Sequence, residues 1–232
     1  PNTIRSGWLK YYQKSIKNII NNSELIFTPS QYIKNEVQDK FEIEKERIIS
    51  VPNGLPTFFN QNLCDQDLLK AELKYSKYKR YIFAIGTLEP RKNYLNLLKA
   101  FEIISEKDKE LYLIICGDKG WLYEELFNYL SKSSCYEKII FPGKIEDYEA
   151  KYLYKNCQIF VYVSLYEGFG IPILEAAVFN CKILTSRNSP MAEIIKDDYF
   201  LCNPNNYHQI AEKILLIISD NKFPQIQLDE YS

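Results

Sequence analysis

The sequence predicts an α/β protein built on a doubly wound parallel sheet. From Tyr81 onward, short runs of β-branched and aromatic residues alternate with segments of about ten residues in which apolar side chains recur at helical spacing. This alternation is typical of βαβ units, whose parallel strands are joined by helical crossovers. Glycine, proline and charged residues follow several of the apolar runs. Because ligands of such sheets bind at the carboxyl ends of the strands, we expect the functional residues in these loops.

Length and charge narrow the class of protein. The 232 residues, 46% of them apolar, suffice for one large α/β domain, or for one domain with part of another. A net charge of −1 argues against a nucleic-acid partner. No apolar stretch reaches membrane-spanning length and no signal peptide is recognisable. We therefore expect a cytoplasmic protein, either free or held peripherally at the inner face of the membrane.

The six cysteines occur without any C-x-x-C pair. This spacing favours reduced, mostly buried thiols over disulfides or a zinc site. We expect no metal and no cofactor.

The first part of the chain carries four predicted elements. They are a helix that includes Trp8 to Ile20, a strand at Glu24–Thr28, a helix at Gln31–Lys40 with Ser30 as its N-cap, and a strand at Arg47–Val51. In the first helix an apolar stripe opposes a basic face, which predicts a packed helix with solvated lysines; contact with a membrane surface is the alternative. The stripe consists of Trp8, Tyr12, Ile16, Ile19 and Ile20, and the basic face of Lys10, Lys14 and Lys17.

The remaining elements alternate regularly. Residues 55–80 are expected to form a linker with a polar helix at Asp65–Leu73. The predicted strands that follow are Tyr81–Ile85, Leu111–Cys116, Lys138–Phe141, Ile159–Val163 and Cys181–Thr185. The predicted helices are Tyr94–Ser105, Trp121–Ser131, Asp147–Lys155, a segment that begins at Pro172, and Asn206–Ser219, with Pro190–Ile195 and Tyr199–Cys202 between the last strand and the last helix.

The most informative stretch joins the strand that ends at Val163 to the next helix. It reads Glu167-Gly-Phe-Gly170 and then Ile171-Pro172, and proline suits the first helical position because its missing N–H costs nothing there. A helix N-terminus behind a glycine loop offers unpaired N–H groups and a positive dipole end to an anion. Glu167 and Glu175 bracket this place, with seven residues between them. Amides for a diphosphate and carboxylates for ribose and sugar hydroxyls predict a nucleotide-sugar site.

The run E-G-F-G-I-P-I-L-E resembles the E-x7-E motif of retaining glycosyltransferases of family 4, which have the GT-B fold. The alternative is an ordinary βα turn with one surface glutamate and one glutamate on a helix face. Glu-Gly-Phe-Gly before a proline-led helix is more specific than the spacing alone. The resemblance implies that Glu175 holds the ribose hydroxyls and that Glu167 holds those of the transferred sugar. The donor contacts that it implies along the loop are Gly168, Phe169, Gly170 and Ile171.

A second motif follows the strand Tyr81–Ile85. In Gly86-Thr-Leu-Glu-Pro-Arg-Lys-Asn93 the glycine permits a tight turn, and Arg91 and Lys92 stand beside a helix N-terminus. Cations are unfavourable at a helix N-terminus unless an anion is present, so Arg91 and Lys92 predict a diphosphate site. The alternative is that both side chains are simply solvated. The segment is similar to the family's G-x-x-x-x-R-K-N element, whose Arg and Lys bind the donor diphosphate. The resemblance implies that Gly86, Arg91 and Lys92 bind the donor, and that Arg91, Lys92 and Glu167 are catalytic.

Two further loops are expected at the same edge of the sheet. Phe141-Pro-Gly-Lys-Ile-Glu-Asp147 resembles the family's loop around the nucleobase, which places Lys144 and Ile145 beside the base; Asp147 is expected to be an N-cap. Cys116-Gly-Asp-Lys-Gly120 resembles the family's G-x-G turn, and a plain turn is an equally good alternative.

Two charged or titratable positions are expected to lie outside the chemistry. Glu193 matches the glutamate of the family's S-x-x-x-E-V and is predicted to be mainly structural. His208, the only histidine, is predicted to be a surface or packing residue rather than a catalytic base.

The resemblance also predicts how the chain is divided. Residues 1–52 resemble the closing segment of a GT-B N-terminal (acceptor) domain, 53–80 a linker with a first helix, 81–219 the Rossmann-like nucleotide-sugar domain, and 220–232 a tail. The chain is thus expected to be one half of a GT-B fold, and Pro1 at its start fits a piece of a longer product. After the second glutamate the family usually has A-M-A-x-G. Here Asn180 takes the place of the glycine, and asparagine can also provide a left-handed helix cap.

The function expected from this resemblance is a retaining, metal-independent transfer of sugar from a nucleoside-diphosphate sugar to an acceptor, in polysaccharide or glycoconjugate synthesis. The acceptor is a polysaccharide, a lipid-linked sugar or a protein. One alternative is a nucleotide-sugar-binding module without catalysis of its own. Another is a GT-B-fold nucleotide-sugar epimerase. Such enzymes carry catalytic carboxylates and histidines in the cleft, whereas this chain has only His208.

Overall fold

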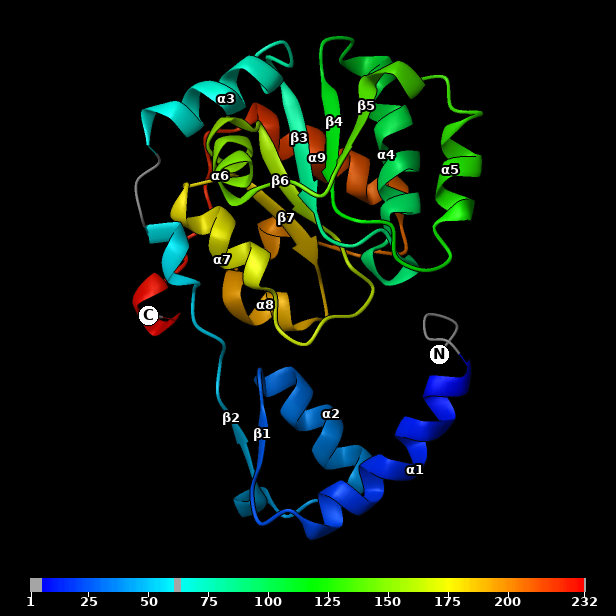
Figure 1. Ribbon diagram of the computed structural model, residues 1–232, viewed down its shortest axis with the longest axis vertical. Coiled ribbons are helices and arrows are strands. Elements are labelled where there is room, and N and C mark those ends of the chain that lie inside the picture. The colour runs from blue at the N-terminus through cyan, green and yellow to red at the C-terminus, as the bar shows by residue number, and fades with distance from the viewer. Residues whose placement is uncertain (1–5, 61–63, 232) are drawn as a thin grey trace.

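In the computed structural model, which describes residues 6–60 and 64–231, the chain forms two lobes of unequal size (Figure 1). The small lobe, residues 6–50, has a two-stranded sheet, and the large lobe, residues 64–219, has a six-stranded sheet. Each lobe has a hydrophobic core of its own. Residues 51–60 connect the lobes, and residues 220–231 return to this connection, where the Leu55 N–H donates to the Tyr231 carbonyl at 2.9 Å.

The small lobe is built from two helices and two parallel strands. Its elements are α1 (Ser6–Asn22), β1 (Ile26–Thr28), α2 (Gln31–Phe41) and β2 (Ile48–Ser50). Strands β1 and β2 pair in parallel, with Ile26 opposite Ile48. Ser30 is the N-cap of α2, as predicted, and its hydroxyl accepts the N–H of Ile33 at 3.2 Å. The small lobe therefore presents a well-capped helix N-terminus toward the large lobe (Figure 1).

The apolar stripe of α1 is mostly exposed, so the predicted packed helix is wrong for this stripe. Tyr12, Ile16 and Ile19 are 56%, 38% and 63% exposed, and Ile20 alone among the described stripe residues is buried. The physical reason is the size of the small core, which gives Ile20 two other buried apolar partners among the residues described. The side chains of Trp8, Lys10 and Lys14 lie outside the described residues. Among the helices that the structure describes, none combines the length and apolar character needed to cross a membrane.

The large lobe has the doubly wound parallel sheet that the sequence predicts. Its strands are β3 (Tyr81–Ile85), β4 (Tyr112–Cys116), β5 (Ile139–Gly143), β6 (Ile159–Tyr162), β7 (Ile183–Ser186) and β8 (Leu201–Cys202). Their order in the sheet is β5-β4-β3-β6-β7-β8, and every neighbouring pair is parallel. This is the strand order of dinucleotide-binding folds, in which the direction of winding reverses between the first and fourth strands of the domain. Here the reversal falls between β3 and β6.

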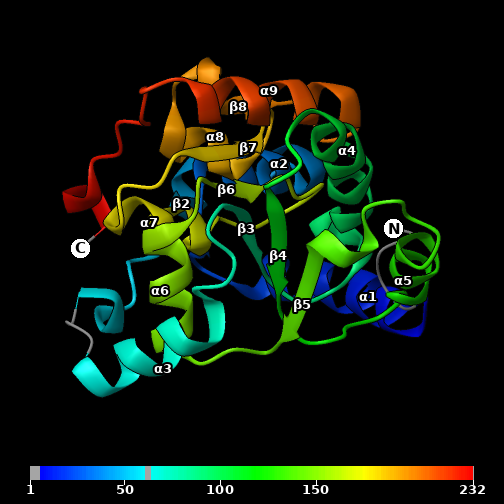
Figure 2. The same cartoon turned by 90° about the horizontal axis from the view of Figure 1, so that it is seen from above.

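Helices cover both faces of this sheet. They are α3 (Asp65–Tyr75), α4 (Tyr94–Lys107), α5 (Glu124–Leu130), α6 (Asp147–Asn156), α7 (Ile171–Val178), α8 (Pro190–Ile195) and α9 (Tyr207–Ser219). Figure 2 shows α4, α5 and α9 on one face, and α3, α6 and α7 on the other. Because both faces are covered, β3, β4, β6 and β7 are buried at nearly every position, which explains their continuous apolar runs, whereas the edge strand β5 is half-buried after Ile139.

Local details of several helix ends correct or confirm the sequence predictions. The helix predicted from Trp121 begins at Glu124, because Leu122 has a positive φ of 55° that interrupts helical geometry. Asp147 is the first helical residue and not the N-cap; Glu146 is the cap, and its N–H donates to Oε2 of Glu149 at 2.9 Å. Asn180 adopts the left-handed conformation predicted for it, with φ 50°.

Candidate functional site

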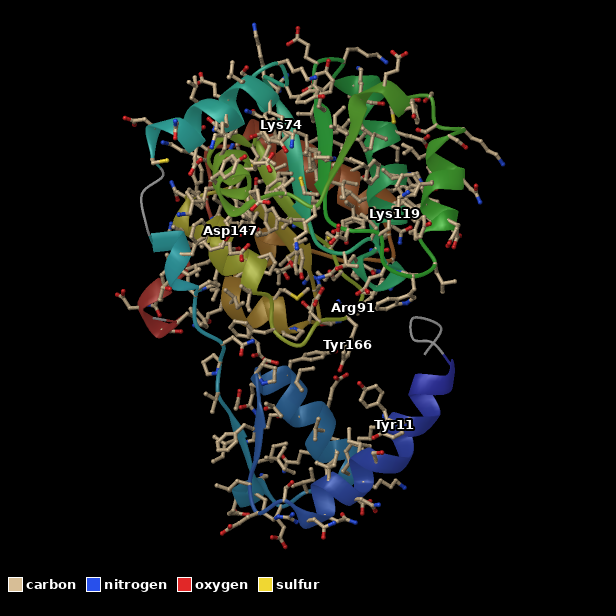
Figure 3. The ribbon with its side chains drawn as sticks, viewed as in Figure 1. Tyr11, Lys74, Arg91, Lys119, Asp147 and Tyr166 are labelled. Carbon is tan, nitrogen blue, oxygen red and sulfur yellow. The ribbon has the colours of Figure 1, made fainter. Side chains whose placement is uncertain are left out.

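The candidate site lies where the sheet order reverses, at the carboxyl ends of β3 and β6. The two strands run parallel, with Phe83 opposite Phe160, so the loops that leave them emerge side by side. These are loops 86–93 and 163–170, in which the sequence predicts donor contacts. Figure 3 shows Arg91 and Tyr166 at the edge of the large lobe that faces the small lobe, with Tyr11 of α1 across from them. Ligands of open α/β sheets bind in this crevice.

Four charged side chains from the two loops form a largely buried cluster. Glu167 Oε1 accepts from Lys92 Nζ at 2.7 Å, and Glu167 Oε2 accepts from Arg91 Nη1. Arg91 Nε also donates to Oε1 of Glu89 at 2.8 Å. The Tyr162 hydroxyl donates to Glu167 Oε1 at 2.9 Å and lies 2.6 Å from Lys92 Nζ. We call Glu89, Arg91, Lys92, Glu167 and Tyr162 the ion cluster; it brings together the three residues predicted to be catalytic.

Most hydrogen-bond donors of the two cations are used inside the cluster. Arg91 directs Nε and one Nη2 proton to Glu89, and its Nη1 protons to Glu167 and to the Tyr166 carbonyl, which lies at 2.9 Å. One Nη2 proton remains for another partner. Lys92 likewise uses two of its protons, on Tyr162 and Glu167, and keeps one. The cluster is charge-balanced, with two carboxylates against two cations, and each cation retains one donor that no described residue accepts.

Glu175, the second glutamate of the motif, lies in a different environment. It is half-buried on α7, and its Oε2 accepts the hydroxyl proton of Tyr154 at 2.8 Å. The Tyr154 side chain is itself buried in the main core, where its ring contacts those of Phe83 and Phe160. No salt bridge to Glu175 occurs among the described residues. This leaves the carboxylate with acceptor capacity for a ligand.

Residues 65–230, which include both loops of the ion cluster and Glu175, match the family of glycosyl transferases group 1. The chain belongs to this family. Because the match covers most of the chain, including the whole six-stranded sheet, the family assignment applies to the large lobe in full.

The sequence relatives are glycosyltransferases of longer chain. O-antigen chain mannosyltransferase B of Escherichia coli is 29% identical over 222 residues, which are 94% of this chain and 58% of that protein. O-antigen chain mannosyltransferase RfbU of Salmonella typhimurium is 24% identical over 196 residues, 84% of this chain and 51% of that protein. The chain thus spans about half the length of these curated relatives.

Solved structures of glycosyltransferases share the fold. A glycosyltransferase from Rickettsia africae superposes with a TM-score of 0.75 at 21% identity, over 94% of this chain and 58% of that one. The Anabaena protein HepE in complex with UDP-glucose superposes with a TM-score of 0.76 at 18% identity, over 89% of this chain and 57% of that one. The chain therefore has the architecture of about half of a GT-B glycosyltransferase.

Two glycines near the site have positive φ values and close neighbours where a Cβ would stand. Gly170, the N-cap of α7, has φ 133°, and a Cβ there would lie 2.8 Å from Met191 Cγ. Gly86 has φ 142°, and a Cβ there would lie 3.0 Å from Lys92 Cε. The Lys92 side chain therefore folds back over the glycine that begins its own loop. Pro172 takes the second helical position of α7, after Ile171, rather than the first position that the sequence predicts.

The loop predicted to hold the nucleobase leaves the neighbouring edge of the sheet. Lys144 is exposed and Ile145 is half-buried just after β5. The turn 116–120 lies between this loop and the ion cluster, where Gly117 donates its N–H to the Gly143 carbonyl at 2.8 Å. A Cβ on Gly117 would lie 2.0 Å from the Gly86 carbonyl oxygen, so the three loops cross too closely for a side chain.

A cavity of about 210 Å³ lies beside the ion cluster. It is formed by the first turns of α4 and α5 and is lined by Glu89, Asn93, Asn96 and Leu122, with Leu165 among the other apolar residues. None of the residues predicted to bind the donor lines it.

The pKa values of the two motif glutamates shift in opposite directions. Burial raises the pKa of Glu167, but the charges of Lys92 and Arg91 outweigh it and hold the pKa below its ordinary value. Burial also raises the pKa of Glu175, and the hydrogen bond from Tyr154 offsets this only in part, so its pKa is raised. For Lys92, burial outweighs the attraction of Glu167 and lowers the pKa of the ammonium group.

Sequence reasoning missed Glu89, Tyr162 and Tyr154. The Glu89 side chain is 3% exposed, although a glutamate in a loop next to a proline reads as a surface residue. Tyr162 and Tyr154 fall in an apolar strand and on a helix, where their rings are expected in the core. Glu89 stands two residues before Arg91, but this spacing alone does not indicate that the two side chains form an ion pair. His208 is exposed on α9, in line with the predicted surface position.

Proposed function

We propose that this chain is the donor-binding part of a retaining, metal-independent glycosyltransferase that uses a nucleoside-diphosphate sugar. The ion cluster at the point where the sheet order reverses is the observation that carries the proposal. It places two cations and a carboxylate directly before the N-terminus of α7, where the helix dipole and unpaired N–H groups favour an anion such as a phosphate. The relatives' names and the description of HepE with UDP-glucose support a sugar nucleotide as substrate.

In this proposal the diphosphate lies between α7 and the two cations. The backbone amides of Phe169 to Ile171 and the positive end of the α7 dipole face its oxygens. Lys92 and Arg91 each direct the one remaining donor to it. As the glycosidic bond breaks, negative charge grows on the leaving diphosphate, and these groups stabilise it without a metal ion. Gly86 lets Lys92 fold back toward this place.

The two glutamates are proposed to hold hydroxyl groups. A carboxylate can accept about four hydrogen bonds, and Glu167 accepts three, from Lys92, Arg91 and Tyr162. One acceptor position therefore remains for a hydroxyl of the transferred sugar. Glu175 accepts a single bond from Tyr154, which leaves positions for both ribose hydroxyls. Lys144 and Ile145 are proposed to lie beside the base.

The acceptor and the cellular site of action are proposed for the whole protein, because the chain spans only about half the length of its relatives. The names of the relatives favour a polysaccharide acceptor of the O-antigen type and mannose as the first sugar to test. The rest of an N-terminal domain is proposed to supply the acceptor site, in a cytoplasmic enzyme that works at the inner face of the membrane. A donor phosphate oxygen is proposed to help deprotonate the acceptor hydroxyl.

Calorimetric titration of the chain with UDP, GDP and ADP tests the proposal. We expect one nucleotide to bind selectively, and Glu175→Ala to weaken that binding about tenfold. The matched control is Glu212→Ala, which removes an exposed glutamate from α9, outside the site. If a folded chain binds none of the three nucleotides, or if the two variants bind alike, the proposed donor site is wrong.

A further inference from the structure

The two lobes touch through the N-terminal part of α2, and these contacts converge on the loop that carries Glu167. The Ser30 hydroxyl donates to the Gly168 carbonyl at 2.9 Å. The N–H of Gln31, the first residue of α2, donates to Glu193 Oε2 at 3.0 Å. One turn further along, Glu36 accepts the hydroxyl proton of Tyr166 at 2.7 Å. Figure 1 shows this end of α2 directly below α8 and the loop before α7.

Ser30 joins the two lobes with a hydroxyl that both donates and accepts a hydrogen bond. It is 3% exposed, and its oxygen accepts the Ile33 N–H that caps α2. A hydroxyl has a single proton to donate, and Ser30 gives it to Gly168. Gly168 follows Glu167 in the chain, so the cap of α2 is bonded to the peptide next to the proposed sugar-binding carboxylate. The capping residue of one lobe thereby fixes a backbone group of the other.

Glu193 completes the contact from α8. Its carboxylate accepts from the first N–H of α2, where the helix dipole favours negative charge. Met191 of the same short helix packs against Gly170, close enough to exclude a Cβ at 2.8 Å. The loop is thus held between α8 and the cap of α2. The glutamate predicted to be mainly structural is a contact between the lobes.

A cavity also lies at this contact, beside Ser30, Gln31 and Glu193. It has a volume of about 180 Å³ and lies between Pro29 and Pro52 on the small-lobe side, and Phe169 and Tyr231 on the large-lobe side. The hydrogen bonds from α2 thus join the small lobe directly to the loop before α7 and to α8.

We infer that Ser30 and Glu193 are positioning residues that hold loop 166–170, and with it Glu167, in the geometry of the donor site, so that the placement of the small lobe sets the geometry of that site. The inference rests on the proposed function of the loop. It assigns to the α2 cap a role in the reaction in addition to its role in helix stability.

The test separates the cap from the contact between the lobes. Ser30→Asp keeps an acceptor for the α2 cap but has no proton for Gly168, whereas Ser30→Thr keeps both. The control for the added charge is Asn206→Asp at the N-cap of α9, where Asn206 accepts from Gln209 N–H at 3.0 Å and has no bond to the small lobe. Amide hydrogen exchange is measured on the ligand-free chain, over the segment that contains loop 166–170.

We expect exchange in this segment to be about three- to tenfold faster in Ser30→Asp, and unchanged in Ser30→Thr and Asn206→Asp. In Ser30→Asp the affinity for the preferred nucleotide should fall by a similar factor. Equal exchange in Ser30→Asp and wild type would overturn the inference, and so would an equal increase in Ser30→Thr. If the wild-type chain bound no nucleotide, the proposed function would fail, while the exchange comparison would still decide the role of the cap.

If Ser30→Asp does not fold, Glu193→Gln decides in its place. Glutamine keeps the length and one acceptor oxygen but removes the charge that faces the α2 dipole. A twofold or greater increase in exchange of loop 166–170, at an unchanged exchange rate of the β3 amides, supports the inference. Exchange equal to that of the wild type in this variant contradicts it.

Discussion

The two glutamates of the motif belong to one loop and helix, yet the structure gives them opposite environments. Glu167 accepts bonds from two cations and a tyrosine, while Glu175 accepts a single bond from Tyr154. Glu167 is therefore a member of a charge-balanced cluster, and its removal changes the cluster as a whole. Glu175 has no ion-pair partner among the described residues and is bonded to Tyr154. Two glutamates of one motif can therefore differ in how much stability their removal costs and in how many acceptor positions they keep for a ligand.

The largest expected effect separates the two glutamates in stability. Glu167→Gln leaves Lys92 and Arg91 with one carboxylate between them, and we expect the free energy of unfolding to fall by about 2–3 kcal/mol because a partly buried ion pair loses its partner. Addition of Lys92→Met removes the surplus charge, so the double variant should be about 1–2 kcal/mol more stable than the sum of the two single variants predicts. Urea unfolding of the four proteins measures this, and strict additivity would contradict the cluster.

A smaller effect concerns pH. Because burial raises the pKa of folded Glu175, this group favours folding below its unfolded pKa of about 4.3, and that contribution is lost as the pH rises through the folded pKa. Glu175→Gln should therefore stabilise the chain at neutral pH but not in acid. This gain should be smaller than the loss caused by Glu167→Gln. For Glu167 the pKa is lowered, so its contribution is present above the unfolded pKa and is lost as the pH falls through the folded pKa.

Urea unfolding of both variants between about pH 4 and pH 7 measures these opposite signs. The free energy of unfolding should differ from that of the wild type increasingly as the pH rises. It should be higher than wild type in Glu175→Gln and lower in Glu167→Gln. If both substitutions changed the free energy of unfolding in the same direction at neutral pH, the two environments would not differ as described.

The sheet and most helices were predictable because their signals are local. A parallel strand buried on both faces is a continuous apolar run, and Tyr81–Ile85 and Ile159–Tyr162 show it without help from the fold. Helix ends were harder. Aspartate is a common N-cap, so Asp147 was the expected cap, but the bond that the Glu146 N–H donates to the Glu149 carboxylate places the cap at Glu146.

The partners inside the site were less predictable because they are far apart in the chain. Arg91 and Glu167 were each predicted to bind the donor, but their bond to each other spans 76 residues, and no local pattern records it. The bond from Ser30 to Gly168 spans 138 residues. The prediction that the apolar stripe of α1 is packed was wrong for a similar reason. Amphipathic spacing shows that a helix has an apolar face, but it does not show whether a core covers that face.

The central claim is that the ion cluster binds a diphosphate. The most direct test is calorimetric titration with the nucleoside diphosphate and monophosphate of the preferred base, on the wild-type chain and on Lys92→Met, with Lys99→Met of α4 as control. We expect the wild type and the control to prefer the diphosphate about tenfold or more, and Lys92→Met to reduce this preference to about twofold or less. An unchanged preference in a Lys92→Met protein that is folded would show that the diphosphate lies elsewhere.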